Sequence, residues 1–497
     1  MVRLTRTLIR QWARLGPRFL PFADAASPEL PLRRLLRLSL FQVSVGMALA
    51  LLVGTLNRVM IVELHVPAAL VALMVALPVL YAPLRTLIGH RSDTHHCALG
   101  WRRVPFIWMG TLMQFGGLAV MPFALLVLSG GGNAGAWPAW VGQAGAALAF
   151  LMVGAGLHTT QTAGLALATD LVPRAAQPKV VGLMYVTLLF GTIVAAFGFG
   201  AFLSTFTPGR LVQVIQAAAV ITLVLNAIAL WKQESRDPTR SVQPTHEPSF
   251  AEAWRRYSEG PGARRRLLAI GLGTMGFAMQ DVLLEPYGGH VLGMSVGHTT
   301  WLTAALALGG LIGFSVASQV LSRGADPARM ATAGAAGGLP AFAAVIAAAS
   351  TQSLPLFVAG VVLLGLAGGV FGHGTLTLTM RHAPKEQTGL ALGAWGAVQA
   401  TAAGVAIALG GVGRDIVHAL AEQGVFGPAA SGPATGYIVI YGVEFVLLVG
   451  TMVVMFGLVG APRAGAAVSR PSAAARAGEP RLGGVAHAAD HERIATS

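Results

Sequence analysis

Long apolar stretches alternate with short polar connections over most of this chain. Each stretch is long enough to cross a bilayer, because a membrane span needs roughly 20 predominantly apolar residues. Inside the hydrocarbon region such a segment satisfies its backbone hydrogen bonds as a helix. The pattern therefore predicts an all-α membrane protein with twelve transmembrane helices. Their expected ranges are 38–56, 67–88, 104–128, 138–168, 179–206, 211–231, 267–289, 299–322, 330–350, 354–380, 388–412 and 436–460.

The basic residues are sorted between alternate connections. Of the 34 Lys and Arg residues, 30 fall in the N-terminal segment, the even-numbered connections and the C-terminal tail. Only Arg58, Arg210 and Arg414 fall in odd-numbered connections, and Arg85 lies in the second apolar stretch. Basic residues accumulate in cytoplasmic loops, so we expect a bacterial inner-membrane protein with both termini in the cytoplasm.

The composition indicates which class of protein and which partners this basic charge suits. With 54% hydrophobic and 11% charged residues, the chain is not a soluble globular protein. The net charge of +14 lies at the ends of the spans, where anionic lipid is the expected partner and nucleic acid is not. The sequence shows no Cys/His metal cluster, phosphate-binding glycine loop or nucleophile elbow, so we expect no enzyme chemistry.

The longest internal connection, 232–266, divides the pattern into two six-helix halves, at 38–231 and 267–460. We expect this connection to be a cytoplasmic linker. In the segment 1–37, arginines recur every three or four residues opposite an apolar face, which predicts an amphipathic helix in the cytoplasmic interface. Arginines that only fix the topology are the alternative. The tail 461–497, rich in Ala, Gly, Arg and Pro, is expected to be disordered and cytoplasmic.

Six spans, a long basic loop and six more spans resemble the layout of the major facilitator superfamily. The loop GHRSDTHHCALGWRR (89–103) resembles the signature loop of that superfamily, in which a glycine precedes an aspartate by four residues and a second glycine precedes a basic pair. The resemblance implies a cytoplasmic charge relay between Asp93 and Arg102 or Arg103. Extra residues between Asp93 and Gly100 depart from the pattern, so a role in topology alone stays open.

Charges inside the apolar stretches need a reason, because a charge near the bilayer centre costs at least ~2.5 kcal/mol. Asp281 and Glu285 in the seventh stretch are four residues apart and project from one helix face. Two such carboxylates suit a proton or cation site, while a partly wet helix end is the alternative. Asn57 and Arg58 lie near the end of the first stretch. Arg58 is expected to pair with Glu63 or with an acid of the seventh helix.

Each half places one histidine among glycines in its fourth helix. These are His158 in GAGLHTTQTAG (154–164) and His373 in GGVFGHGTLT (368–377). Small neighbours let a large group approach a helix, and a neutral imidazole nitrogen can bind a metal. A histidine that packs between helices and bonds a nearby hydroxyl or carbonyl is the other interpretation, which spacing alone favours.

Four stretches carry a more specific resemblance. They are LRLSLFQVSVGMALALLVGTLNRVMIVEL (36–64), RSDTHHCALGWRRVPFIW (91–108), HTTQTAGLALATDLVP (158–173) and GFAMQDVLLEPYGG (276–289). They resemble the bacteriochlorophyll-delivery branch of the superfamily found in anoxygenic phototrophs, the PucC/LhaA type. The similarity runs over about residues 15–462.

Members of this branch assist assembly of the light-harvesting antenna complexes LH1 or LH2 in the intracytoplasmic membrane of purple bacteria. The resemblance therefore implies an assembly factor that binds and delivers bacteriochlorophyll or chaperones antenna polypeptides, with bacteriochlorophyll synthase as a further candidate partner. It also implies magnesium ligation by His158 and His373. Gln161 would bond a ring carbonyl. Asp281 and Glu285 would act in gating or in contact with an antenna subunit.

Two other functions stay open at this point. A proton-coupled secondary transporter of a small solute would use Asp281 and Glu285 as protonation sites. A scaffold that fences antenna subunits laterally would bind no pigment of its own. Pigment bound to the purified protein separates the assembly factor from both alternatives.

Overall fold

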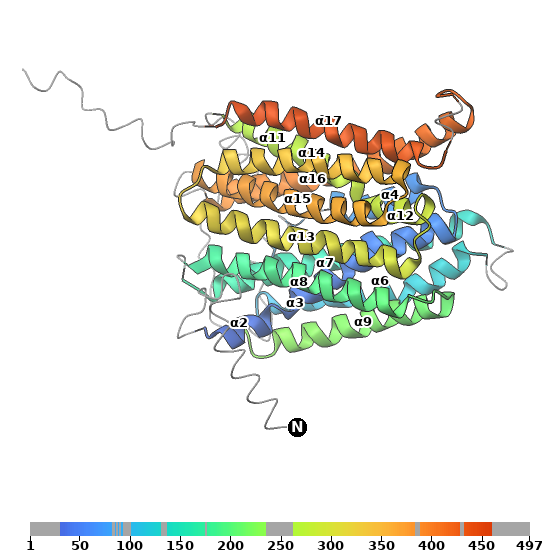
Figure 1. Ribbon diagram of the computed structural model, residues 1–497. Coiled ribbons are helices and arrows are strands. Elements are labelled where there is room, and N and C mark those ends of the chain that lie inside the picture. The colour runs from blue at the N-terminus through green and yellow to red at the C-terminus, as the bar shows by residue number, and fades with distance from the viewer. Residues whose placement is uncertain are drawn as a thin grey trace, which may run out of the picture. The chain divides into compact units, whose positions relative to one another are not determined.

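A computed structural model describes residues 30–81, 85, 88, 91–92, 101–130, 137–173, 176–234, 262–382, 388–427 and 432–459. Every regular element in these ranges is helical (Figure 1). In chain order the elements are α2 (Leu32–Leu38), α3 (Leu40–Leu49), η2 (Ala50–Leu56), η3 (Val59–Glu63), α4 (Ala68–Leu80), α6 (Val104–Leu128), α7 (Ala139–Asp170), α8 (Gln177–Phe202), α9 (Pro208–Leu230), α11 (Ala263–Ala278), η7 (Met279–Val282), α12 (Leu284–His290), α13 (Val296–Ser322), α14 (Pro327–Thr351), α15 (Leu354–His382), α16 (Thr388–Glu422) and α17 (Thr435–Phe456).

Eleven helical runs among the described residues are long and apolar enough to cross a membrane. A shorter apolar helix, Ala68–Val79, lies at the place of the second predicted span. The prediction of an all-α, multi-pass membrane protein is thus confirmed. The cytoplasmic placement of both termini and the division into two halves stay predictions. The expected interfacial helix at the N-terminus and the tail 461–497 lie outside the described residues.

Two spans continue past arginines that the sequence pattern placed in connections. The first helical run continues to Glu63 and α16 continues to Glu422, so Arg58 and Arg414 lie inside helices and not in connections. Each guanidinium has an anion nearby in its own helix. Arg58 pairs with Glu63, and Arg414 Nη1 lies 2.8 Å from Asp415 Oδ1. The pattern ends a span at a charge, although the pairing of Arg58 with Glu63 was one of the two expected from the sequence.

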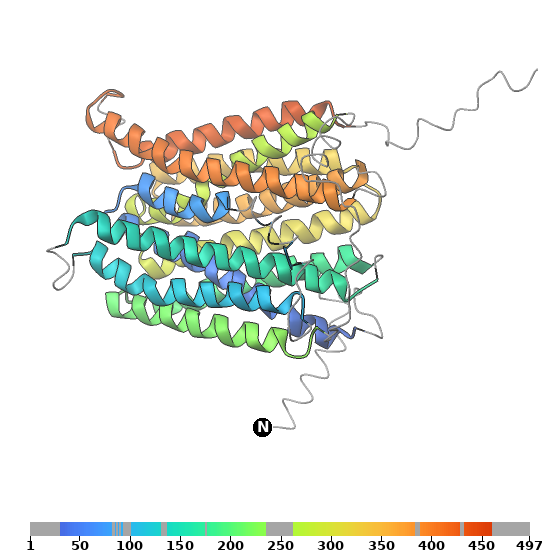
Figure 2. The ribbon, with the colours of Figure 1, turned by 180° about the vertical axis from the view of Figure 1, so that it is seen from behind.

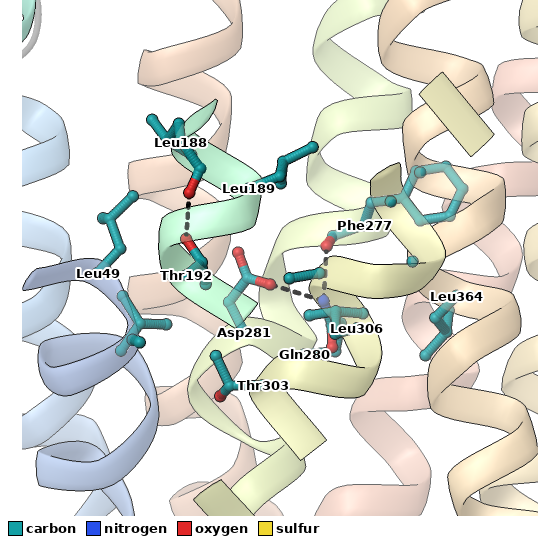
Figure 3. Close-up of a pocket in the computed structure, with 16 residues that line it drawn as sticks. Leu49, Leu188, Leu189, Thr192, Phe277, Gln280, Asp281, Thr303, Leu306 and Leu364 are labelled. Carbon is teal, nitrogen blue, oxygen red and sulfur yellow. Dashed lines mark hydrogen bonds between the residues drawn. The ribbon is translucent and has the colours of Figure 1, made fainter. Parts of the chain in front are cut away.

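The helices of residues 38–231 (the N-terminal half) and 267–460 (the C-terminal half) lie mostly on opposite sides of the bundle, blue to green and yellow to red in Figures 1 and 2. Within the halves, α6 packs on α7, and α15 packs on α13 and α14. Two helix pairs join the halves, since α8 packs on α13 and α4 packs on α16. Residues from both halves therefore meet in the interior, as the close-up in Figure 3 shows.

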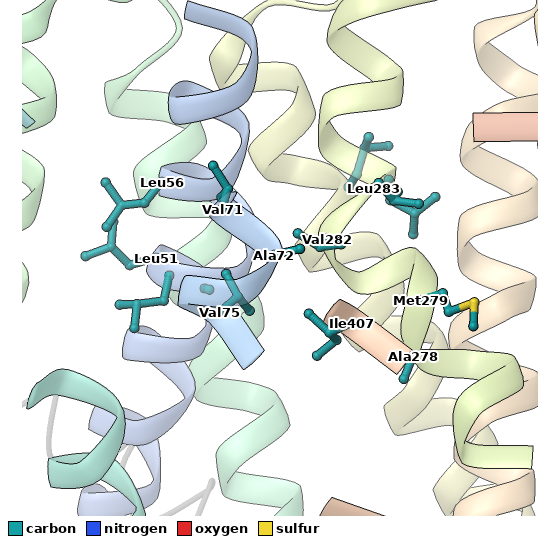
Figure 4. Packing of buried hydrophobic residues seen from close by; sticks show 14 of the residues in the cluster. Leu51, Leu56, Val71, Ala72, Val75, Ala278, Met279, Val282, Leu283 and Ile407 are labelled. Carbon is teal, nitrogen blue, oxygen red and sulfur yellow. The ribbon is translucent and has the colours of Figure 1, made fainter. Parts of the chain in front are cut away.

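One buried apolar cluster continues from one half into the other (Figure 4). Leu51 of the first span belongs to it together with Val282 and Ile407. Lipid tails are as apolar as these side chains, so close packing, and not burial from water, holds such helices together. One close approach is at Gly313 of α13, where an added methyl group would lie 2.9 Å from the carbonyl carbon of Leu366 in α15. Glycine thus lets two backbones touch.

Candidate binding site at a broken helix between the two halves

The seventh span is a broken helix. A 3-10 turn at Met279–Val282 separates α11 from α12. Inside a membrane protein such a break persists only where other groups take up the freed backbone hydrogen bonds. Two side chains from other spans do so. Glu444 Oε1 accepts from the Gln280 N–H at 2.8 Å, and Asn57 Nδ2 donates to the Val282 carbonyl at 2.9 Å. Broken helices in membrane bundles commonly form binding sites.

The first span is also irregular where it meets this break. Two π-helical segments, η2 and η3, follow α3, and Asn57 lies between them. π-Helical turns are rare and are frequent at functional sites. An added methyl group at Gly54 of η2 would lie 2.6 Å from Thr303 Oγ1 and would collide with the Glu285 carboxylate. Glycine at this position therefore allows the first span to touch both the seventh and the eighth spans.

A cavity of about 370 Å³ lies beside the break (Figure 3). This volume is at the lower end of the roughly 300–1,000 Å³ that small-molecule sites occupy. Its polar lining residues are Thr192, Gln280, Asp281 and Thr303. The rest of the wall, contributed by both halves, consists of Leu49, Ala50, Val53, Leu188, Leu189, Phe277, Leu306, Ala307, Gly310, Leu364, Gly365 and Gly368. The site is thus a mostly apolar cavity with one polar side.

The two acids predicted on one helix face lie in different elements. Asp281 belongs to the 3-10 turn and lines the cavity, whereas Glu285 belongs to α12 and is only 3% exposed. Thr303 connects them, because it lines the cavity with Asp281 and donates to Glu285 Oε1 at 2.5 Å. Glu285 Oε2 is buried and has no hydrogen-bond partner in the part of the chain that the structure describes. Glu285 is therefore buried inside the bundle and is not a wet helix end.

Arg58 pairs with Glu63 of its own span, which is one of its two expected partners. Its Nη2 also donates to the Met294 carbonyl, just before α13, at 3.2 Å. Arg58 itself is 4% exposed. Together with the bond from Asn57 to the broken helix, these contacts tie the end of the first span to the C-terminal half.

The residues expected to bind pigment do not line this cavity. His158 lies on α7 and His373 on α15, whose main packing partners belong to different halves. The Nδ1 atoms of both histidines are buried and have no hydrogen-bond partner among the described residues. The ring of His373 lies against Phe314, with 4.2 Å between the centroids. Gln161 Nε2 donates to Gln42 Oε1 at 3.5 Å. The structure therefore does not bring the three residues into one site.

The basic pair of the predicted relay meets Asp170 at the end of α7. Arg102 Nη2 and Arg103 Nε lie 2.6 and 3.1 Å from Asp170 Oδ2. The carboxylate of Glu234, just after α9, accepts from three backbone N–H groups at the start of α6 at 2.9–3.1 Å. An anion at a helix N-terminus is favourable because of the helix dipole. Asp93, the expected relay partner, lies outside the described residues.

Sequence patterns missed most of the residues that shape the break and the cavity. Glu444 is visible as a charge in the last span, but its partner is a backbone N–H that only the 3-10 turn sets free. Thr192 and Thr303 give no signal, because hydroxyl groups are common in transmembrane helices. Gln280 could have been singled out, since it forms a polar pair with Asp281 inside an apolar stretch.

The fold is an all-helical membrane bundle with a cavity between its halves, and it matches the folds of solved membrane transporters. The solved structure of nucleoside transporter NupG matches with a TM-score of 0.61 and 13% identity, over 85% of this chain and 99% of that chain. A bacterial homologue of the human lysosomal transporter Spinster matches with a TM-score of 0.60 and 17% identity, over 85% and 94%. At these identities the likeness concerns the fold alone.

The sequence matches the family described as PUCC protein over residues 55–462. Protein PucC of Rhodovulum sulfidophilum is 63% identical over 421 residues, which cover 84% of this chain and 93% of that protein. Protein PucC of Cereibacter sphaeroides is 58% identical over 458 residues, 92% and 98% of the two chains. The bacteriochlorophyll synthase 44.5 kDa chain of Rhodobacter capsulatus is 28% identical over 439 residues, 86% and 96% of the two chains. The chain therefore belongs to the PucC family.

Proposed function

We propose that this protein assists assembly of light-harvesting antenna complexes, LH1 or LH2, in the intracytoplasmic membrane. It binds bacteriochlorophyll and delivers it to antenna polypeptides, or holds those polypeptides during assembly. Membership of the PucC family across residues 55–462 is the observation that carries this proposal. The relative named as a bacteriochlorophyll synthase chain supports a link to the pigment, and that enzyme is a candidate partner.

The surroundings of the two histidines favour His373 as the ligand for a pigment magnesium. Both histidines are half-buried, but an added methyl group at Gly372, beside His373, would meet nothing within 4 Å. At His158, by contrast, Thr162 lies on the next turn of the helix and Arg85 contacts it. The Thr162 hydroxyl donates to the His158 carbonyl at 2.7 Å and accepts from Arg85 Nε at 2.9 Å. Arg85 therefore occupies space beside this turn of α7, which leaves less room for a flat macrocycle at His158.

A near-infrared absorption spectrum of the protein, purified in mild detergent from a pigment-producing phototroph, tests the proposal. Mass spectrometry must first show that antenna and reaction-centre proteins are absent. A stoichiometric bacteriochlorophyll band supports pigment binding. A colourless, folded protein contradicts it, and co-purification of antenna polypeptides from a strain without bacteriochlorophyll would then favour the scaffold.

Replacing His373 by leucine is expected to lower pigment retention, while the replacement of His158 leaves it nearly unchanged. A ligand bond worth ~1.4 kcal/mol or more corresponds to a loss of at least tenfold in affinity. The measurement is the ratio of pigment to protein after purification. His382→Leu is the matched control, because this histidine lies at the end of the same helix and its Nδ1 is bonded to the Leu378 carbonyl at 2.9 Å. Equal losses in all three variants would assign the effect to destabilised protein.

A proton-coupled transporter of a small solute is the second candidate, favoured by the Asp281 carboxylate on the wall of the cavity. In that case Asp281→Asn, which keeps the shape of the side chain and removes its charge, abolishes solute-dependent proton entry. The measurement uses proteoliposomes loaded with a pH-sensitive dye and a panel of nucleosides, peptides and amines. Glu422→Gln, at an exposed acid at the end of α16, is the control and should retain proton entry. A wild-type protein that moves no proton with any solute argues against this candidate.

A further inference from the structure

The amide group of Gln280 has no hydrogen left to offer to the cavity. Its Nε2 donates to Asp281 Oδ1 at 2.6 Å and to the Phe277 carbonyl at 3.1 Å (Figure 3). A side-chain amide has two donor hydrogens, and an ionised carboxylate has none. Gln280 Oε1 has no hydrogen-bond partner within the described ranges, although the residue is 3% exposed. Gln280 and Asp281 together therefore present lone pairs only.

The two hydroxyl groups on the wall have also donated their hydrogens elsewhere. Thr192 Oγ1 donates to the Leu188 carbonyl at 3.0 Å, and Thr303 Oγ1 donates to Glu285 Oε1 at 2.5 Å. A hydroxyl carries a single donor hydrogen. With Asp281 ionised, all four polar side chains that line the cavity thus have only acceptor lone pairs left to offer.

We infer that this cavity binds an amphiphile whose single polar head donates hydrogen bonds, either a hydroxyl or an ammonium group. The head lies at Gln280 and Asp281, where it satisfies the unpartnered amide oxygen, and the hydrocarbon body lies against the leucines of the wall. A carboxylate or phosphate head is rejected, since it would set acceptor against acceptor and negative charge against Asp281. The inference goes beyond the proposed function and does not depend on pigment bound at His373.

The test uses the full chain in lipid nanodiscs and a long-chain alcohol that carries a photoactivatable diazirine in its chain. Mass spectrometry of the digested protein is expected to find adducts in the segments that line the cavity, 188–192, 303–310 and 364–368. Decanol and decylamine are expected to suppress this labelling at concentrations at least about tenfold lower than decanoate, a preference of ~1.4 kcal/mol. Equal competition by decanoate overturns the inference, and so does labelling confined to the lipid-facing residues.

Three variants locate the labelling and separate the two kinds of head. Ala307→Phe fills the cavity and should abolish the adducts, whereas Ala217→Phe, on an exposed face of α9, should leave them unchanged. Asp281→Asn should weaken competition by decylamine and preserve competition by decanol, because only the ammonium head pairs with the charge of Asp281. Persistent labelling in folded Ala307→Phe overturns the inference, and the comparison of decanol with decanoate on the wild-type protein needs no variant.

Discussion

Replacing Gly313 by alanine is expected to lower the melting temperature of the detergent-solubilised protein, whereas replacing Gly442 by alanine leaves it unchanged or raises it. An alanine methyl at Gly313 would lie 2.9 Å from the carbonyl carbon and 3.0 Å from the Cα of Leu366, so two backbones must separate. Overpacking of this kind costs typically about 1–3 kcal/mol. At Gly442 the methyl meets nothing within 4 Å, and alanine gains up to about 1 kcal/mol of helix propensity.

The contrast between these two glycines separates close packing from backbone flexibility. If glycine served only to make the helices flexible, both alanine variants would be stabilised. The measurement is a thermal melt followed by size-exclusion fluorescence, with both variants expressed under identical conditions. A Gly313→Ala protein as stable as the wild type would show that α13 and α15 can move apart without loss. In that case their contact would not hold the C-terminal half together.

The order of the helices and the position of most spans could be predicted because the bilayer interior offers no hydrogen-bond partners to the backbone. Any segment inside it must be apolar and must pair its own backbone, so composition alone locates most spans. Their ends depend on single charges and were predicted less well. Arg58 and Arg414 ended two predicted spans, yet each finds an anion within five residues of its own helix.

The candidate site could be predicted only in part, for a different reason. Asp281 stands out because a charge in an apolar stretch is rare. The 3-10 turn around it is stabilised by Asn57 and Glu444, which are hundreds of residues apart in the sequence. Local sequence patterns do not indicate such long-range contacts. For the same reason the sequence placed Glu285 on the face of Asp281, whereas the turn assigns them to different elements.

Replacing Glu444 by leucine is expected to destabilise the protein, and replacing it by glutamine is not. Glu444 is fully buried, and its Oε1 accepts from the Gln280 N–H at 2.8 Å. Leucine leaves that buried N–H unpaired, which costs about 1–3 kcal/mol. Glutamine retains an oxygen of the same reach, so the bond persists and the stability changes by less than about 1 kcal/mol. The free energy of unfolding, measured by denaturation in mixed micelles, distinguishes the two variants.

If Glu444→Leu stabilises the protein, that result also has a definite physical meaning. A buried charge without a partner is expensive, so its replacement by an apolar side chain can stabilise a protein. If both Glu444→Leu and Glu444→Gln raise the free energy of unfolding, the cost of the charge exceeds the value of the bond to the 3-10 turn. If only leucine lowers it, Glu444 acts by holding the turn, and the leucine variant should also weaken labelling of the cavity by the photoactivatable alcohol. The Glu444 side chain of the last span would then hold Gln280 and Asp281 in the cavity wall.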